Sequence, residues 1–153
     1  MIAANIMTTD VIILREGMTV QEALMIMGEK RIRQLPVIDG DGKVLGILTS
    51  RRLLEVILPR YITERLLKDV KFAPDLPQLY QKLQGLAQKD VRDIMDRKPV
   101  KIGPEVSLLE VATIFVNAKR PLESILVVDD EDRLLGIIAP WDVCKTVCKY
   151  SGE

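Results

Sequence analysis

The chain has 153 residues, the size of one ordinary globular domain and enough to bury a hydrophobic core. Its 22 Lys and Arg balance its 22 Asp and Glu, and aromatic residues make up only 4%, which argues against nucleic-acid and membrane-surface partners. Histidine is absent, which excludes catalytic triads and most transition-metal sites. No apolar run is long enough to span a membrane and the first five residues lack the layout of a signal peptide, so we expect a cytoplasmic protein.

The first part of the chain predicts strand, helix, strand, strand and helix in that order. The apolar run at 11–14 suits a short buried strand, and Thr19 with Glu22 has the spacing of a capping box before an amphipathic helix. Two apolar runs at 35–38 and 44–48 flank an Asp-Gly-Asp-Gly turn. A second helix starts near Ser50 and ends by Leu58, because the following proline disfavours helix at the residue before it.

Residues 59–90 differ in pattern from what precedes and follows them. Two segments, 61–70 and 78–88, look helical, and the stretch 72–77 between them contains two prolines. The segment carries too many large apolar side chains for a flexible linker. We expect it to pack on a flank of the chain, on a sister subunit or on a partner protein.

Residues 91–150 repeat the order of the first part. The predicted strands are 100–102, 125–128 and 134–138, Ser107 begins a second capping box, and a last helix runs from Pro140 to about Lys149. Met7 and Met95 are 88 residues apart, as are Thr19 and Ser107. Such regular spacing indicates a duplicated unit.

The two cysteines stand four residues apart on the last predicted helix. Trp141, Cys144 and Cys148 form an apolar stripe at helical spacing. A redox pair would need close sulfurs and a lowered thiol pKa, whereas a buried free cysteine behaves as a small hydrophobic residue. We predict that the stripe belongs to the core.

The duplicated landmarks resemble a tandem pair of CBS domains. The residues that carry the resemblance are 6–8, 19–23, 32–39 and 46–49 in the first copy and 91–95, 107–112, 126–129 and 136–138 in the second. The resemblance implies an α+β fold of two β-α-β-β-α repeats packed about a pseudo-twofold axis. The predicted divisions are repeat 1 at 1–58, a helical insertion at 59–90 and repeat 2 at 91–150.

The same resemblance implies a non-enzymatic regulatory module. Members dimerise into a flat disc of four repeats, so a homodimer is expected. Their clefts bind adenosine compounds (AMP, ADP, ATP or S-adenosylmethionine) as regulatory ligands and not as catalytic cofactors, and binding regulates another protein. The alternative is a scaffold with closed clefts that serves only dimerisation and partner binding.

The resemblance also places two polar groups in each cleft. A hydroxyl at a helix N-terminus favours phosphate, and a carboxylate three residues later accepts hydrogen bonds from a ribose diol. Repeat 1 has Thr49 with Arg52 in place of the acid, whereas repeat 2 has Asp142 with Ala139 in place of the hydroxyl, followed by Pro140. We expect one nucleotide per chain in the Asp142 cleft, with the Arg52 cleft empty or serving only phosphate. Alternatively, Asp142 is a first-turn acid that complements the helix dipole, and Arg52 is a solvated helix residue.

Two further groups of residues are candidates for the site because of their positions relative to the predicted strands. Arg33, Lys119 and Arg120 precede the second strands and are candidates for phosphate contact, or else ordinary surface cations. The candidates for an apolar adenine slot are Val100, Ile102, Pro121, Leu122 and Ile138, or else ordinary core residues. We interpret the acidic segments 39–42 and 129–132 as turns, because they lack the spaced ligands of a calcium loop.

Overall fold

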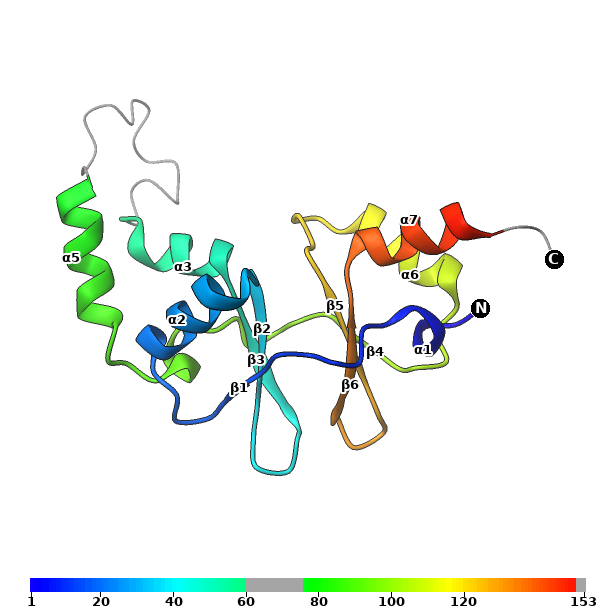
Figure 1. The fold of residues 1–153 in the computed structure, drawn as a ribbon, viewed down its shortest axis with the longest axis horizontal. Coiled ribbons are helices and arrows are strands. Elements are labelled where there is room, and N and C mark those ends of the chain that lie inside the picture. Colours follow the sequence, from blue (N-terminus) through cyan, green and yellow to red (C-terminus); the bar gives the residue numbers. More distant parts are fainter. Residues whose placement is uncertain (60–75, 151–153) are drawn as a thin grey trace.

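The computed structural model describes residues 1–59 and 76–150. Two repeats of strand, helix, strand, strand and helix stand side by side (Figure 1), as the sequence predicts. Repeat 1 contains β1 (Leu14–Arg15), α2 (Val20–Lys30), β2 (Gln34–Ile38), β3 (Val44–Thr49) and α3 (Ser50–Ile57). Repeat 2 contains β4 (Lys101–Ile102), α6 (Leu108–Asn117), β5 (Ile125–Val128), β6 (Leu134–Ile138) and α7 (Pro140–Lys149). Outside them lie the short helix α1 (Ala3–Ile6), helix α5 (Leu76–Leu86) and the 3-10 turn η2 (Val91–Asp93).

Each repeat has a three-stranded sheet of the same topology. β1 is parallel to β2 and β2 is antiparallel to β3, and β4, β5 and β6 repeat this order. The first strand of each sheet is shorter than predicted, because only two residues pair with the central strand. Residues 11–13 approach β1 as half-buried chain without strand pairing. The central strands are buried, as their continuous apolar runs require.

Both predicted capping boxes are present. The Thr19 Oγ1 accepts from the Glu22 amide at 3.2 Å, and the Glu22 carboxylate accepts from the Thr19 amide at 3.2 Å. Ser107 and Glu110 make the same pair of bonds at 3.2 and 3.3 Å. These bonds satisfy amides that have no partner within the helix, so they fix where α2 and α6 begin.

The repeats exchange the segments that precede them. Ala3 and Ile6 are buried in the core of repeat 2, whereas Ile94 and Met95 are buried in the core of repeat 1. The exchange is closed by isolated β-bridges from Thr8 to Ile137 and from Asp96 to Ile47. We call the segment with Ala3, Ile6 and Thr8 the leader of repeat 1 and the segment with Ile94, Met95 and Asp96 the leader of repeat 2. Each leader packs on the other repeat and not on the repeat that it precedes in the sequence.

Two glycines make the exchange sterically possible. A Cβ at Gly136 would lie 2.7 Å from the Sδ of Met7, and one at Gly46 would lie 2.7 Å from the Sδ of Met95 and 2.5 Å from the Asp96 carbonyl oxygen. Contacts this short are forbidden to a real side chain. Both repeats therefore need glycine where the incoming methionine crosses the last strand.

The two sheets meet along the last strands and their hairpins. Val44, Ile47 and Leu126 form a buried cluster between the repeats. The Val44 amide donates to the Asp132 carbonyl at 3.0 Å, and the Leu134 amide donates to the Gly42 carbonyl at 3.1 Å, so the hairpins join side by side (Figure 1). The acidic segments form turns, as predicted.

The insertion packs on repeat 1 through its described part. Helix α5 begins at Leu76, two residues before the predicted start at 78, with Pro77 in its first turn, where a missing amide costs little. Leu86 is buried in the repeat 1 core, and α5 lies beside α3. Of the three predicted locations for the insertion, α5 therefore takes the flank of the chain. The other predicted helix, 61–70, lies outside the described residues.

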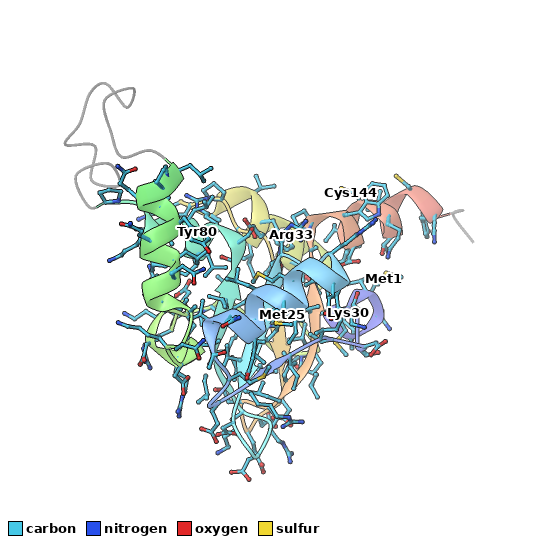
Figure 2. All side chains as sticks on the ribbon, turned by 60° about the vertical axis from the view of Figure 1, so that its left-hand side comes forward. Met1, Met25, Lys30, Arg33, Tyr80 and Cys144 are labelled. Carbon is cyan, nitrogen blue, oxygen red and sulfur yellow. The ribbon has the colours of Figure 1, made fainter. Side chains whose placement is uncertain are left out.

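The prediction that the α7 stripe is core is wrong. Both Cys144 and Cys148 are exposed, Trp141 is 66% exposed, and α7 contains no fully buried residue. Helix α7 contacts the repeat 2 core through Val143, which leaves the stripe on another side with no covering element from the described chain. Cys144 lies on α7, at the opposite end of the molecule from Tyr80 on α5 (Figure 2). Helical spacing identifies an apolar face but not what covers it.

Candidate ligand-binding cleft

A cleft of about 870 Å³ opens between the two repeats. This volume lies in the usual range of sites for small organic ligands. One wall comes from the end of β3 and the start of α3, and the facing wall comes from the loop between α6 and β5. The segment that follows η2 completes the cleft. Neither repeat forms it alone.

The first wall is built around the N-terminus of α3. Thr49 is the cap, and its Oγ1 accepts from the Arg52 amide at 3.0 Å. The Arg52 guanidinium donates to the Ile94 carbonyl at 2.7 Å and to the Glu55 carboxylate at 3.2 Å. Arg52 therefore ties α3 to the leader of repeat 2 while still lining the cleft.

The facing wall is the loop that connects α6 to β5. It presents Lys119 and Arg120, which are exposed, next to Pro121 and Leu122. The Glu123 carbonyl accepts from the Gln34 side-chain amide at 3.4 Å, which links this loop to repeat 1. Ser124 closes the wall with a side chain that is almost fully buried. The loop thus offers cations and an apolar surface side by side.

The lining of the cleft is cationic on balance. The basic residues are Arg51, Arg52, Arg97, Lys98, Lys119 and Arg120, against the acids Glu55, Asp93, Asp96 and Glu123. Six against four leaves a formal excess of two positive charges. Within the described residues, Glu55 pairs with Arg51 and Arg52, whereas no ion pair is formed by Lys98, Lys119 or Arg120. Unpaired cations beside a helix N-terminus favour an anionic ligand.

The structure divides the residues predicted for the site into two groups. Those that line the cleft are Thr49, Arg52, Val100, Lys119, Arg120, Pro121 and Leu122. The other six do not line this cleft. Ile138 is fully buried and Ile102 packs against it in the repeat 2 core, while the Arg33 guanidinium donates to the Met27 and Ile32 carbonyls at 3.3 Å.

The remaining three residues, Ala139, Pro140 and Asp142, form the start of α7. The Asp142 carboxylate accepts from the Ala139 amide at 2.7 Å and from the Lys145 ammonium at 3.4 Å. Its side chain is only 13% exposed. These contacts are those of a first-turn acid, and the predicted ribose contact stays a prediction.

The sequence analysis did not predict all the residues that line the cleft, nor that the cleft is assembled from both repeats. The end of repeat 1 faces the loop of repeat 2, so Thr49 and Arg52 line this cleft, whereas Ala139 and Asp142 at the equivalent positions of repeat 2 do not. Arg97 and Lys98 line the cleft, and neither was a predicted site residue. The signal that could have found them is the basic pair directly after the leader of repeat 2.

Two further observations bear on the class of protein. None of the helices in residues 1–59 and 76–150 is long and apolar enough to cross a membrane. The same residues contain no group of three or more His, Cys, Asp or Glu side chains placed to hold a metal ion.

Comparison with known proteins agrees with the duplicated landmarks. The CBS domain model matches residues 3–59 and again residues 91–149. The chain belongs to the CBS domain family. It is a tandem CBS pair, and the fold predicted from the sequence is confirmed.

Related sequences include proteins of similar length and proteins that are much longer. The protein MJ1426 of Methanocaldococcus jannaschii is 24% identical over 96% of this chain and 91% of its own length. The inosine-5'-monophosphate dehydrogenase of the same organism is 32% identical over 94% of this chain, but the match covers only 23% of that enzyme. The tandem pair therefore corresponds to a minor part of the dehydrogenase.

Solved structures show the same fold. CBSX2 from Arabidopsis thaliana, crystallised in complex with AMP, has a TM-score of 0.72 at 21% identity over 97% of this chain and 96% of that chain. The protein MJ1225 from Methanocaldococcus jannaschii has a TM-score of 0.75 at 22% identity over 95% of this chain and 47% of that chain.

Proposed function

We propose that this protein is a non-enzymatic regulatory module that binds a phosphate-bearing adenine nucleotide in the cleft between its repeats. The observation that carries the proposal is the juxtaposition of the α3 N-terminus with Lys119 and Arg120 from the opposite wall. Phosphate oxygens are suited to both groups. The AMP complex of CBSX2, a protein of the same fold, supports an adenosine compound as the ligand.

The apolar part of the cleft suits the base of such a ligand. Val100, Pro121 and Leu122 lie in the same cleft as the cations, and Val100 is 36% exposed. An apolar slot beside a few polar groups is the usual composition of a small-molecule site. A ligand with one flat apolar end and one anionic end matches this arrangement. S-adenosylmethionine, which carries a positive sulfonium, matches it less well than AMP, ADP or ATP.

A second groove gives the module a route to a partner. It has a volume of about 570 Å³ and lies between α3 and α5. Glu55 and Asp93 line both this groove and the cleft. Arg52 holds Glu55 from the cleft side, so a phosphate that attracts the Arg52 guanidinium would leave Glu55 paired with Arg51 alone at the edge of the groove. We propose that the state of the cleft reaches a partner protein at α5.

The alternative function is a ligand-free scaffold. One observation favours it, because the Arg52 guanidinium already donates to Ile94 and Glu55 and leaves no acceptor at the position expected to hold the ribose. The two functions differ in whether any adenosine compound binds at all.

A thermal-shift panel of AMP, ADP, ATP, S-adenosylmethionine and NADH, with and without magnesium, tests the proposal. A ligand at about 100 times its Kd stabilises the native state by about 2.7 kcal/mol, which is a readily measured shift in melting temperature. We expect ATP or ADP to give the largest shift. If no compound shifts the melting temperature, the scaffold function is correct.

Matched charge variants then locate the site. Arg120→Gln should weaken nucleotide binding about tenfold, the scale of one lost charge-assisted hydrogen bond. Lys43→Gln removes one positive charge from an exposed residue that does not line the cleft, and it should leave the affinity within about twofold. Calorimetry in which both variants bind as tightly as the parent would place the ligand elsewhere.

A further inference from the structure

The α3 wall of the cleft offers hydrogen-bond donors where a ribose diol needs acceptors. The carboxylate on this wall, Glu55, is shared by two guanidinium groups, 3.7 Å from that of Arg51 and 3.2 Å from that of Arg52. The Thr49 Oγ1 already accepts from the Arg52 amide at 3.0 Å. A guanidinium only donates hydrogen bonds. A ribose with two free hydroxyl groups would therefore leave hydroxyl hydrogens without acceptors on this wall.

The Arg52 guanidinium is held in place and still has donors to offer. Its Nε donates to the Ile94 carbonyl at 2.7 Å, and its Nη1 donates to the Glu55 carboxylate at 3.2 Å. Ile94 is buried in the repeat 1 core, so this acceptor belongs to a well-packed segment. Neither bond uses Nη2, and the Arg52 side chain is 36% exposed. A guanidinium that is already oriented loses little conformational freedom when it binds an anion.

The facing wall determines which edge of a bound ribose meets Arg52. The loop between α6 and β5 supplies both the cations Lys119 and Arg120 and the apolar residues Pro121 and Leu122. In an adenine nucleotide, the base and the 5'-phosphate extend from one edge of the ribose, and the 2' and 3' oxygens lie on the opposite edge. With the base and the 5'-phosphate on the loop, the 2' and 3' oxygens face the α3 wall.

We propose that the cleft selects an adenine nucleotide with a phosphate on its ribose, either a 2'-phosphate, as in NADP, or a 3'-phosphate, as in coenzyme A, and that Arg52 binds this phosphate. A ribose phosphate supplies the acceptor oxygens that a guanidinium requires, and the bonds are charge-assisted. In dinucleotide sites generally, an acid binds the free ribose hydroxyl and an arginine accommodates the 2'-phosphate. The inference rests on the proposed nucleotide-binding function and adds the class of nucleotide to it.

Isomeric nucleotides test the proposal by calorimetry. Adenosine 2',5'-bisphosphate and adenosine 3',5'-bisphosphate have the same composition as 5'-ADP, but their second phosphate is on the ribose. We expect one of the two to bind about tenfold to a hundredfold more tightly than 5'-ADP, the scale of hydrogen bonds to a charged group. The preferred isomer identifies the position of the phosphate. ATP carries its additional charge on the 5' chain, so it controls for total charge and should bind less tightly than the preferred bisphosphate.

Variants of two cations then assign the preference to one side chain. Arg52→Gln should reduce the preference for the bisphosphate over 5'-ADP to less than about threefold, because it removes the charged donor. Arg52→Lys keeps the charge without the planar pair of donors, so it should retain part of the preference. Arg120→Gln is the matched control on the facing wall, and it should weaken both compounds while leaving their affinity ratio within about twofold of the parent's. Melting curves check that each variant is folded.

The outcomes separate this proposal from the function on which it rests. If 5'-ADP binds as tightly as both bisphosphates, the selection for a ribose phosphate is wrong, while nucleotide binding in the cleft still stands. A preference that persists unchanged in Arg52→Gln would show that Arg52 does not bind the ribose phosphate. If the titrations of 5'-ADP, ATP and both bisphosphates are all flat, the proposed function and this inference are both wrong.

Discussion

The two repeats share a topology but differ in how completely they are covered. Within the described residues, the repeat 1 core contains twelve buried hydrophobic residues, whereas the repeat 2 core contains six. Four of the twelve come from beyond repeat 1: Leu86 from the insertion, and Val91, Ile94 and Met95 from the segment that precedes the repeat 2 sheet. The difference shows that duplication sets the strand order, while segments from outside a repeat help to decide which of its faces are buried.

The largest expected change in the free energy of unfolding comes from the packing of α5 on the repeat 1 core. Leu86→Ala should lower the free energy of unfolding by about 2–5 kcal/mol, because it removes a buried side chain between α5 and the core. Leu76→Ala, at a position that is 72% exposed on the same helix, should change it by less than about 0.5 kcal/mol. Urea unfolding measures both. Equal effects would mean that α5 does not contribute a buried cover.

The two possible placements of a nucleotide can be distinguished through Asp142. If a nucleotide binds where the sequence predicts, Asp142→Ala should cost about 1.5–3 kcal/mol of affinity, tenfold to a hundredfold in Kd. If it binds in the cationic cleft, as we propose, the affinity should change by less than about twofold, because Asp142 does not line that cleft. Calorimetry of the parent and Asp142→Ala distinguishes the two placements, and two equivalent sites per chain would contradict both.

The exchange of leader segments gives a matched pair of glycine substitutions. Gly46→Ala and Gly136→Ala should each lower the free energy of unfolding by about 1–3 kcal/mol through overpacking. We expect Gly46→Ala to be the worse, because its nearest neighbour would be a backbone oxygen at 2.5 Å instead of the methionine sulfur at 2.7 Å. Thermal unfolding of both variants measures the difference. A larger loss for Gly136→Ala would contradict the prediction that the backbone contact at Gly46 is the more severe of the two.

The smallest expected effect is a pH dependence at the turn of repeat 2. The backbone amides of Arg133 and Glu131, together with the Arg133 guanidinium, hold the pKa of Asp129 below its ordinary value. A carboxyl with a lowered pKa stabilises the folded state above its ordinary pKa, and this stabilisation is lost as the pH falls through the lowered value. The unfolding free energy should therefore fall less steeply below pH 4 in Asp129→Asn than in the parent. Parallel curves would contradict this assignment.

The sequence determined most of the local structure. Thr19 with Glu22 and Ser107 with Glu110 fixed the starts of two helices, because capping involves residues three apart in the chain. The apolar runs at β2 and β5 identified the buried central strands, and the constant spacing between copies identified the duplication. These features depend on neighbours in sequence, so a sequence pattern contains them.

Only the tertiary structure decided which residues share a cleft and which apolar faces are covered. Thr49 and Lys119, which are far apart in the chain, line the same cleft because the two repeats pack against each other. The stripe of Trp141, Cys144 and Cys148 has the same helical period as a core face, yet it is exposed, because no described element lies over α7. Periodicity reports that a face is apolar, whereas burial depends on what packs against it in space.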